Sequence, residues 1–192
     1  MPNWCSNSIT ISGPTKTIKQ LWDDAHVGEG FGLLNAMVPM PTELDATTGP
    51  SDSPNWYDWR VTNWGTKWDI ADEGLEYVDN KDGTGHITGW FDSAWGPPVD
   101  AYNTFLDDMD NCSISATYEE GGMDFAGIYE DGDDQYMEGL ADWCEKVVRG
   151  TCALSDTPEL FQKLEVEFEL IENRREWIEE EIAEEKDKET AN

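Results

Sequence analysis

The spacing of apolar residues near the start of this chain switches from a strand period to a helix period. Residues 6–12 alternate polar and apolar side chains and stop at Gly13-Pro14, a pattern typical of a half-buried strand. Residues 15–26 then place apolar side chains three and four positions apart, which predicts a helix. Because each period requires a different backbone, this segment is expected to fold as strand followed by helix.

The same switch returns later in the chain. Residues 86–95 predict a strand, residues 99–109 predict a helix, and residues 112–118 alternate again as a further strand. Taken together, the order predicts an α+β fold, with a ferredoxin-like split βαβ antiparallel sheet that carries its helices on one face.

Two further segments add to this outline. Residues 56–69 hold four of the ten tryptophans, and we expect this aromatic segment to be packed and irregular or extended. Residues 125–129 and 135–137 flank Asp131-Gly132-Asp133-Asp134, which has the composition of a hairpin turn. We therefore expect extra hairpin strands beside the main sheet.

From Ser155 onward the apolar residues follow a helical period, which predicts one long helix to about Glu185. With 192 residues, one domain with an appended element is the expected organisation. We predict an acidic ferredoxin-like domain over residues 1–150 and a long amphipathic C-terminal helix over residues 155–188. This helix is an extension or an oligomerisation element, and its predicted contact residues are Leu164, Phe168, Ile171, Ile178 and Ile182.

Charge limits which partners the protein can have. The chain has 42 acidic and 12 basic residues, a formal net charge of −30, which disfavours direct binding to nucleic acid and to anionic membranes. A basic protein surface is attracted instead, and the DNA-binding groove of a host enzyme is an example. The alternative is an acidic surface that serves only solubility, including solubility in high salt.

The acidic residues are segregated as well as abundant, because no Lys or Arg occurs between Lys81 and Lys146. Carboxylates two residues apart on a strand lie about 6 to 7 Å apart, comparable to the phosphates of a nucleic acid strand. Such a row can act as a decoy for Arg and Lys side chains that bind phosphate. The predicted partner-binding residues are Asp107, Asp108, Asp110, Glu119, Glu120, Asp124, Glu130, Asp131, Asp133, Asp134 and Glu138.

The cysteines and histidines predict neither a metal site nor a cofactor. The four cysteines form no CxxC pair, and only two histidines could supplement them. We interpret the cysteines as small buried hydrophobic residues with free thiols. No apolar leader or membrane-spanning run is present in the sequence, and we expect the protein in the cytoplasm of its host cell.

Several tryptophan-rich strings together resemble those of the YubB ferredoxin-like, or Api92-like, proteins of phages and plasmids. The strings that carry this resemblance are residues 1–5, 9–13, 37–41, 56–59, 63–69, 91–95 with 97–98, and 121–127. The resemblance implies a mobile-element origin and a ferredoxin-like fold. It implies no established reaction, and it leaves out the helix after Ser155.

Two other functions compete with partner binding. The aromatic segment could stack bases or sugars, with Trp56 and Trp59 as its most exposed rings, although such rings more often form a core. Asp69 and Asp92 each follow an aromatic residue and could form the acid pair of a carbohydrate-active hydrolase. A structural or assembly protein is the remaining alternative. The preferred hypothesis is a non-catalytic inhibitor or regulator, made by a mobile element, that binds a basic surface of a host protein such as a defence nuclease.

Overall fold

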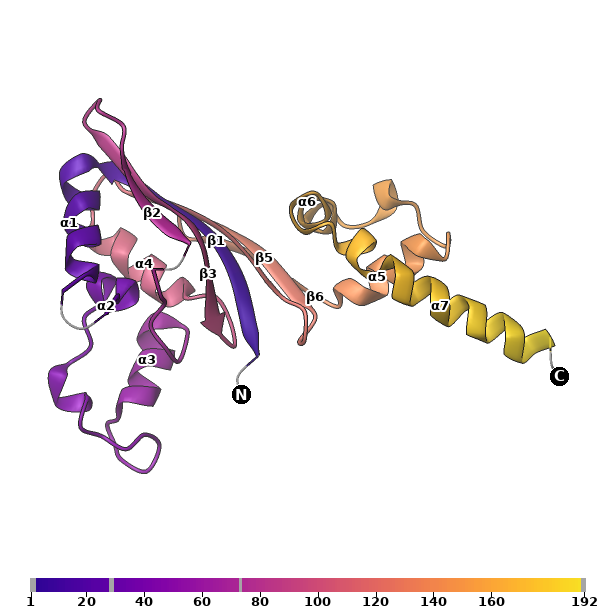
Figure 1. Cartoon of the computed structure of the whole chain (residues 1–192), viewed down its shortest axis with the longest axis horizontal. Coiled ribbons are helices and arrows are strands. Elements are labelled where there is room, and N and C mark those ends of the chain that lie inside the picture. Colours follow the sequence, from indigo (N-terminus) through magenta and orange to yellow (C-terminus); the bar gives the residue numbers. More distant parts are fainter. Residues whose placement is uncertain (1–2, 28–29, 73, 191–192) are drawn as a thin grey trace. The chain divides into compact units, whose positions relative to one another are not determined.

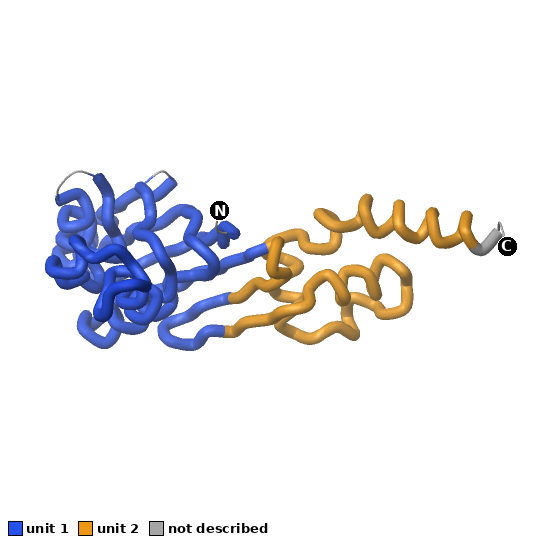
Figure 2. Tube along the Cα trace, turned by 90° about the horizontal axis from the view of Figure 1, so that it is seen from below, with its two compact units in different colours: residues 1–120, 128–134 blue, residues 121–127, 135–192 orange. Residues whose placement is uncertain are grey.

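The computed structural model describes residues 3–27, 30–72 and 74–190. Its chain divides into two compact units (Figure 2). Unit 1 comprises residues 1–120 and 128–134, and unit 2 comprises residues 121–127 and 135–192.

The described strands form one sheet in the order β2-β3-β1-β4-β5-β6. Its strands are β1 (Trp4–Pro14), β2 (Leu75–Asp79), β3 (Thr84–Ala94), β4 (Ser113–Glu120), β5 (Phe125–Glu130) and β6 (Asp133–Glu138). β1 pairs antiparallel with both β3 and β4, and β2 pairs antiparallel with β3. With α1 (Thr15–Ala25) after β1 and α4 (Val99–Asp108) after β3, the predicted α+β class with its split βαβ sheet is confirmed (Figure 1).

The alternation in β1 decides which face of the sheet forms the core of unit 1. Cys5, Ile9 and Ile11 are buried on the side of the helices. Ile18 of α1 and Phe105 of α4 are buried in the same core, and both helices lie on that side (Figure 1). From Ser6 to Ser12 the alternate residues of β1 carry hydroxyl groups and, like Trp4, point to the opposite face, which no helix in the described part of unit 1 covers; we call it the open face.

The aromatic segment is mostly helical, so the prediction of an irregular or extended segment was wrong for α3 (Trp56–Trp64). Asn55 caps this helix by accepting a hydrogen bond from the Asp58 backbone N–H at 2.9 Å. Gly65 ends it with a left-handed φ of 84°. Two shorter helices precede it in the chain: α2 (Leu33–Met37) and the 3-10 turn η1 (Thr42–Leu44).

Unit 2 contains three helices in its described part: α5 (Leu140–Val148), α6 (Glu159–Phe168) and α7 (Leu170–Thr190), with a 3-10 turn η2 (Leu154–Asp156). The long C-terminal helix is confirmed as α7. The sequence predicts one continuous helix from Ser155, and this prediction was wrong. Glu169 has a left-handed φ of 50° and separates α6 from α7. α5 was not predicted.

Candidate functional site

A cleft lined by indole rings lies on unit 1, beside the end of β3. It has a volume of about 250 Å³. We call it the tryptophan cleft, and its lining residues are Trp4, Trp68, Asp69, Ala71, Trp90, Phe91, Asp92, Ser93 and Ala94.

Strand register explains how the cleft forms. Trp90 and Asp92 are two residues apart in β3 and therefore share a face, which is the open face. Trp4 is paired with Ala94, and its ring contacts Trp68 with the centroids 5.7 Å apart. Trp4 is 51% exposed and Trp90 is 60% exposed, so both rings are accessible to a ligand.

The edge of β3 is left partly open at this point. β2 pairs with β3 only as far as Leu75 and Gly89. Beyond that, the Trp90 backbone N–H donates to the Gly74 carbonyl at 3.1 Å, and Thr66 Oγ1 accepts from the Ala94 N–H at 3.1 Å. Residues 66–72 and Gly74 thus lie beside β3 without forming a strand, and Trp68, Asp69 and Ala71 form one wall of the cleft.

A glycine makes this close approach possible. A Cβ atom at position 89 would lie 1.8 Å from the Gly74 carbonyl oxygen, and Gly89 has a φ of 138°, which side chains rarely adopt. Position 89 therefore tolerates only glycine if the loop is to stay against the strand.

Asp69 and Asp92 both line the cleft, but they are held in different ways. Asp69 Oδ1 accepts from the backbone N–H groups of Leu34 and Ile70, both at 2.9 Å, and Oδ2 accepts from the N–H of Asn35 at 3.0 Å. Burial raises the pKa of Asp69, against the lowering effect of these three donors. Asp92 is exposed, and its Oδ1 accepts from Ser6 Oγ at 3.0 Å.

The hydrogen bonds of Asp69 argue against its use as a catalytic acid in the hydrolase alternative. Both oxygens of Asp69 are engaged by main-chain donors at the start of α2, so the carboxyl serves as a helix cap. Catalysis by an acid pair needs each carboxyl to reach the substrate directly. The geometry of Asp69 therefore favours a structural role.

Trp56 and Trp59 were predicted to be the most exposed rings of the aromatic segment. They are half-buried, as is Trp68, whereas Trp64 is buried. Trp56 and Trp59 pack against the core of unit 1. The Arg60 guanidinium lies 5.3 Å from the Trp56 ring and 4.8 Å from that of Trp64, and burial lowers the pKa of Arg60. These cation–π contacts hold α3 together and leave little of its aromatic surface for a ligand.

Trp4 and Trp90 were missed, although the sequence carried a signal for them. Each falls at a polar position of an alternating strand, in phase with Ser6 in β1 and with Asp92 in β3. A tryptophan in phase with the solvent-facing residues of a strand is expected to be exposed.

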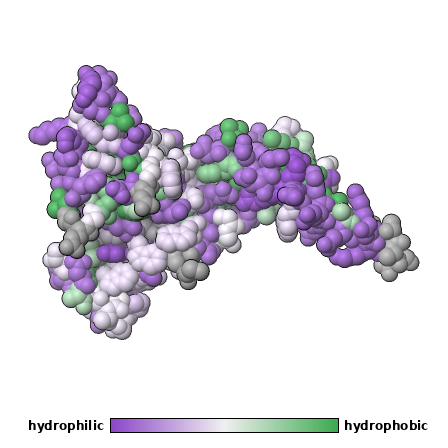
Figure 3. All heavy atoms as spheres, in the orientation of Figure 1, coloured by the Kyte–Doolittle hydropathy of each residue, from purple (hydrophilic) through white to green (hydrophobic). Residues whose placement is uncertain are grey.

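The residues of the predicted acidic surface lie in both units. Asp124 and Glu138 belong to unit 2, and the others belong to unit 1. Asp107 and Asp108 end α4 and Asp110 follows it, and all three are exposed; we call them the α4 acidic end. Figure 3 shows hydrophilic residues over most of the visible face of both units.

Several other predicted partner-binding residues have structural contacts, which corrects their assignment as free surface. Glu120 is 3% exposed. Asp131 accepts from the Ile114 N–H at 2.7 Å, and Asp134 accepts from the Tyr118 hydroxyl at 2.6 Å. Asp124 accepts from the Ala141 N–H at the start of α5. Glu130 accepts a hydrogen bond from the Ser115 hydroxyl. Of the remaining predicted residues, Asp133 and Glu138 are exposed and Glu119 is half-buried.

The predicted oligomerisation stripe is largely internal. Leu164, Ile171 and Ile178 are buried, and Phe168 and Ile182 are half-buried. The stripe packs where α7 contacts α5 and α6. Residues that are already buried inside a folded unit cannot also form a contact between copies, so three of the five predicted residues do not serve that purpose.

All four cysteines are free thiols; Cys5 and Cys144 are buried as predicted, whereas Cys112 and Cys152 are half-buried. Burial raises the pKa of Cys5 to about 12 and that of Cys144 to about 11. Among the residues that the structure describes, no three His, Cys, Asp or Glu side chains are placed to hold a metal ion. No helix within 3–27, 30–72 and 74–190 is both long and apolar enough to cross a membrane.

No protein-family model matches this chain, and neither does any curated protein. Among solved structures, the chain is similar to the protein api92 from Yersinia pseudotuberculosis, with family model DUF1281, at a TM-score of 0.38 and 18% identity. The match covers 55% of this chain and 39% of that chain, so it spans less than half of the api92 protein. At this score the similarity is weak, and the Api92-like resemblance stays a prediction from the sequence.

Proposed function

We propose that this protein is a non-catalytic binding protein. Its acidic surface binds a basic surface of another protein and competes there with nucleic acid. The observation that carries the proposal is that the carboxylates of the α4 acidic end have no basic partner. Among the described residues, no Lys or Arg pairs with Asp107, Asp108 or Asp110.

The position of these carboxylates adds to the argument. The C-terminus of a helix carries a partial negative charge, so acidic residues there are destabilising. α4 nevertheless ends with two aspartates and has no basic residue in its last turn. A stability cost of this kind is expected where the charge serves an intermolecular contact.

Among the described basic residues of unit 1, Lys16 lies beside this region, where it lines a pocket together with Met109, but it forms no ion pair with the three aspartates. Lys19 and Lys81 pair with Asp23 and Asp79, while Arg60 and Lys67 stack on aromatic rings. A partner that presents Arg and Lys side chains for phosphate would gain the missing counter-charges. If the protein shares the mobile-element origin of the family it resembles, a host defence nuclease is such a partner.

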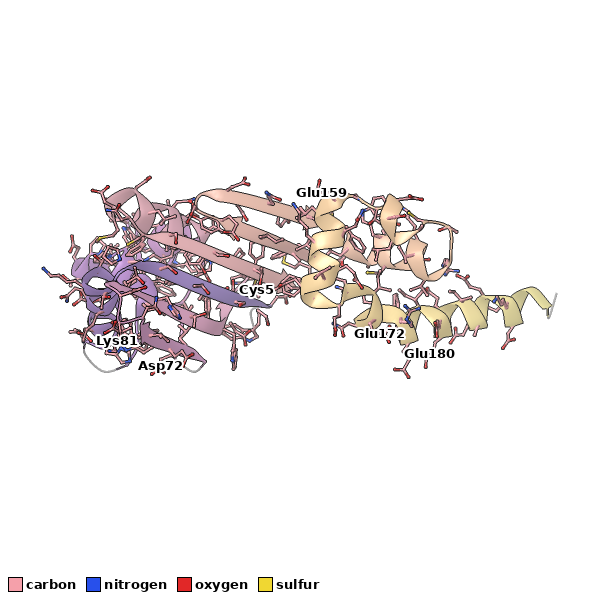
Figure 4. The ribbon with its side chains drawn as sticks, turned by 90° about the horizontal axis from the view of Figure 1, so that it is seen from above. Cys5, Asp72, Lys81, Glu159, Glu172 and Glu180 are labelled. Carbon is pink, nitrogen blue, oxygen red and sulfur yellow. The ribbon has the colours of Figure 1, made fainter. Side chains whose placement is uncertain are left out.

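Affinity capture with matched charge variants tests this proposal. The triple variant Asp107→Asn/Asp108→Asn/Asp110→Asn removes three charges from the α4 acidic end. The control Glu176→Gln/Glu180→Gln/Glu181→Gln removes three from α7, where Glu180 projects outward (Figure 4). We expect only the first to lose captured host protein, and we expect double-stranded DNA to displace that protein from the wild type.

Salt gives a second measurement on the same complex. Binding through several charge pairs should weaken steeply between about 50 and 500 mM NaCl, because exposed charges are screened over about 10 Å at 0.1 M. Affinity that is flat across this range, or a captured protein that DNA fails to displace, contradicts the proposal.

The hydrolase remains the second candidate, because Asp69 and Asp92 line one cleft with three tryptophans. It predicts sugar hydrolysis that Asp69→Asn/Asp92→Asn abolishes. Hydrolysis that persists in this double variant eliminates the acid pair.

A further inference from the structure

We propose that the tryptophan cleft binds an arginine side chain of the basic partner, with Asp92 as its counter-charge. This inference rests on the proposed function and deepens it, because it names an anchoring site separate from the α4 acidic end. The negative charge of Asp92 and the flat indole surfaces of the cleft identify the occupant.

The first element is a carboxylate placed between two indoles. Asp92 is two residues from Trp90 in β3, and it pairs across the strands with Ser6, two residues from Trp4. Residues two apart on one strand are about 6.6 to 6.8 Å apart on the same face. The carboxylate therefore lies on the open face between Trp4 and Trp90.

The second element is that the Asp92 carboxylate is held in place by a hydrogen bond but is not neutralised by an ion pair. Ser6 Oγ donates to Asp92 Oδ1, which holds the carboxylate on the open face. Ser6 also pairs with Glu119 on its other side, so two acidic residues flank it in register. Within the part of the chain that the structure describes, no Lys or Arg forms an ion pair with Asp92.

The third element is the surrounding aromatic surface. Indole faces carry negative potential and attract cations, and the effect adds to that of a carboxylate. The cleft has three indoles and two carboxylates and no basic lining residue. Lys67 already shows this chemistry, since its Nζ lies 4.4 Å from the Trp68 ring.

Arginine fits this site better than lysine. A guanidinium is planar, so it can stack on an indole while its N–H groups bind a carboxylate. The Arg60 side chain makes the same kind of stacking contact with Trp64 in this protein. A sugar ring also stacks on indole, and its hydroxyl groups could donate to Asp92, but a neutral sugar supplies no counter-charge to the carboxylate.

Titration with N-acetylarginine amide, followed by NMR of the tryptophan indole N–H signals, tests the inference. N-acetylcitrulline amide has nearly the same shape without the charge and is the control. We expect the Trp4 and Trp90 signals to shift with the arginine compound, and Asp92→Asn to weaken that binding about three- to tenfold. Trp90→Ala should weaken it similarly, whereas Asp108→Asn should not.

Other outcomes would overturn the arginine site. Equal binding of the citrulline compound, or binding unchanged by Asp92→Asn, shows that the cleft does not select a cation. Shifts of the same signals with cellotetraose but not with the arginine compound identify a sugar site instead.

The two proposals fail in different ways. If partner capture is lost in the Asp107/Asp108/Asp110 variant but kept in both Asp92→Asn and Trp90→Ala, the acidic surface binds and the arginine site is wrong. If the cleft variants lose the partner and the α4 variant keeps it, the arginine site stands and the role of the α4 acidic end is wrong.

Discussion

Asp69 shows how one carboxyl can organise a segment that has little regular structure. Its two oxygens fix the start of α2 and the turn at Ile70, although it lies 34 residues from Asn35 in the chain. Buried backbone N–H groups without an acceptor are costly, so this residue matters for stability.

We predict that Asp69→Ala lowers the free energy of unfolding by about 1 to 3 kcal/mol, because it strips the Leu34 and Asn35 N–H groups of their acceptor. Asp69→Asn keeps one acceptor oxygen and should lose less. Urea unfolding followed by circular dichroism measures both. Equal stability of Asp69→Ala and the wild type would show that solvent replaces the carboxyl.

The cysteines give a prediction about alkaline pH. The folded-state pKa of Cys5 is raised to about 12, above an ordinary value near 9, so its contribution to stability is complete below about pH 9. It is lost as the pH rises from about 9 to 12, because only the unfolded chain releases the proton in that window. Cys5→Ala should make the fall in stability over this window shallower. Urea midpoints at pH 8, 9 and 10 are the measurement, and parallel curves for both proteins would contradict it.

At the scale of elements, the strands and helices of the split βαβ sheet could be predicted, because burial on one face leaves a clear period in the sequence. The helix α3 could not, since its tryptophans favour no single period. Its boundaries did carry signals: Asn55 with Asp58 is a capping pair, and Gly65 is a typical helix end. The exposed rings of the cleft leave a different signal, because Trp4 and Trp90 fall in phase with the polar residues of their own strands.

The break between α6 and α7 left no sequence signal, because glutamate rarely adopts a left-handed backbone. Leu170 and Ile171, the first two residues of α7, are both buried directly after this break. Tertiary packing thus overrides local preference at Glu169.

We predict that Glu169→Gly stabilises unit 2 by up to about 1 kcal/mol, because glycine adopts a positive φ without strain. Glu176→Gly, in the exposed interior of α7, should instead destabilise it by about 1 kcal/mol. Hydrogen exchange of the α6 and α7 amides measures both effects. Faster exchange in Glu169→Gly than in the wild type would mean that the glutamate side chain itself supports the turn.

At the scale of the whole molecule, the net charge of −30 sets up repulsion within the folded chain. We predict that the melting temperature rises as NaCl increases from about 20 to about 500 mM, because salt screens this repulsion. Scanning calorimetry measures it, and the Asp107/Asp108/Asp110 variant should show a smaller rise. A melting temperature that falls or stays level with salt would show that repulsion is not significant for stability.

The stretch between Lys81 and Lys146 also decides how the protein can be cut. It contains β3, α4, β4, β5 and β6, and it has neither lysine nor arginine. Trypsin-like proteases cleave only after those residues, so even a fully unfolded chain would yield this region as one large acidic fragment. That fragment carries Trp90, Asp92 and the α4 acidic end together, beyond the reach of any protease with basic specificity.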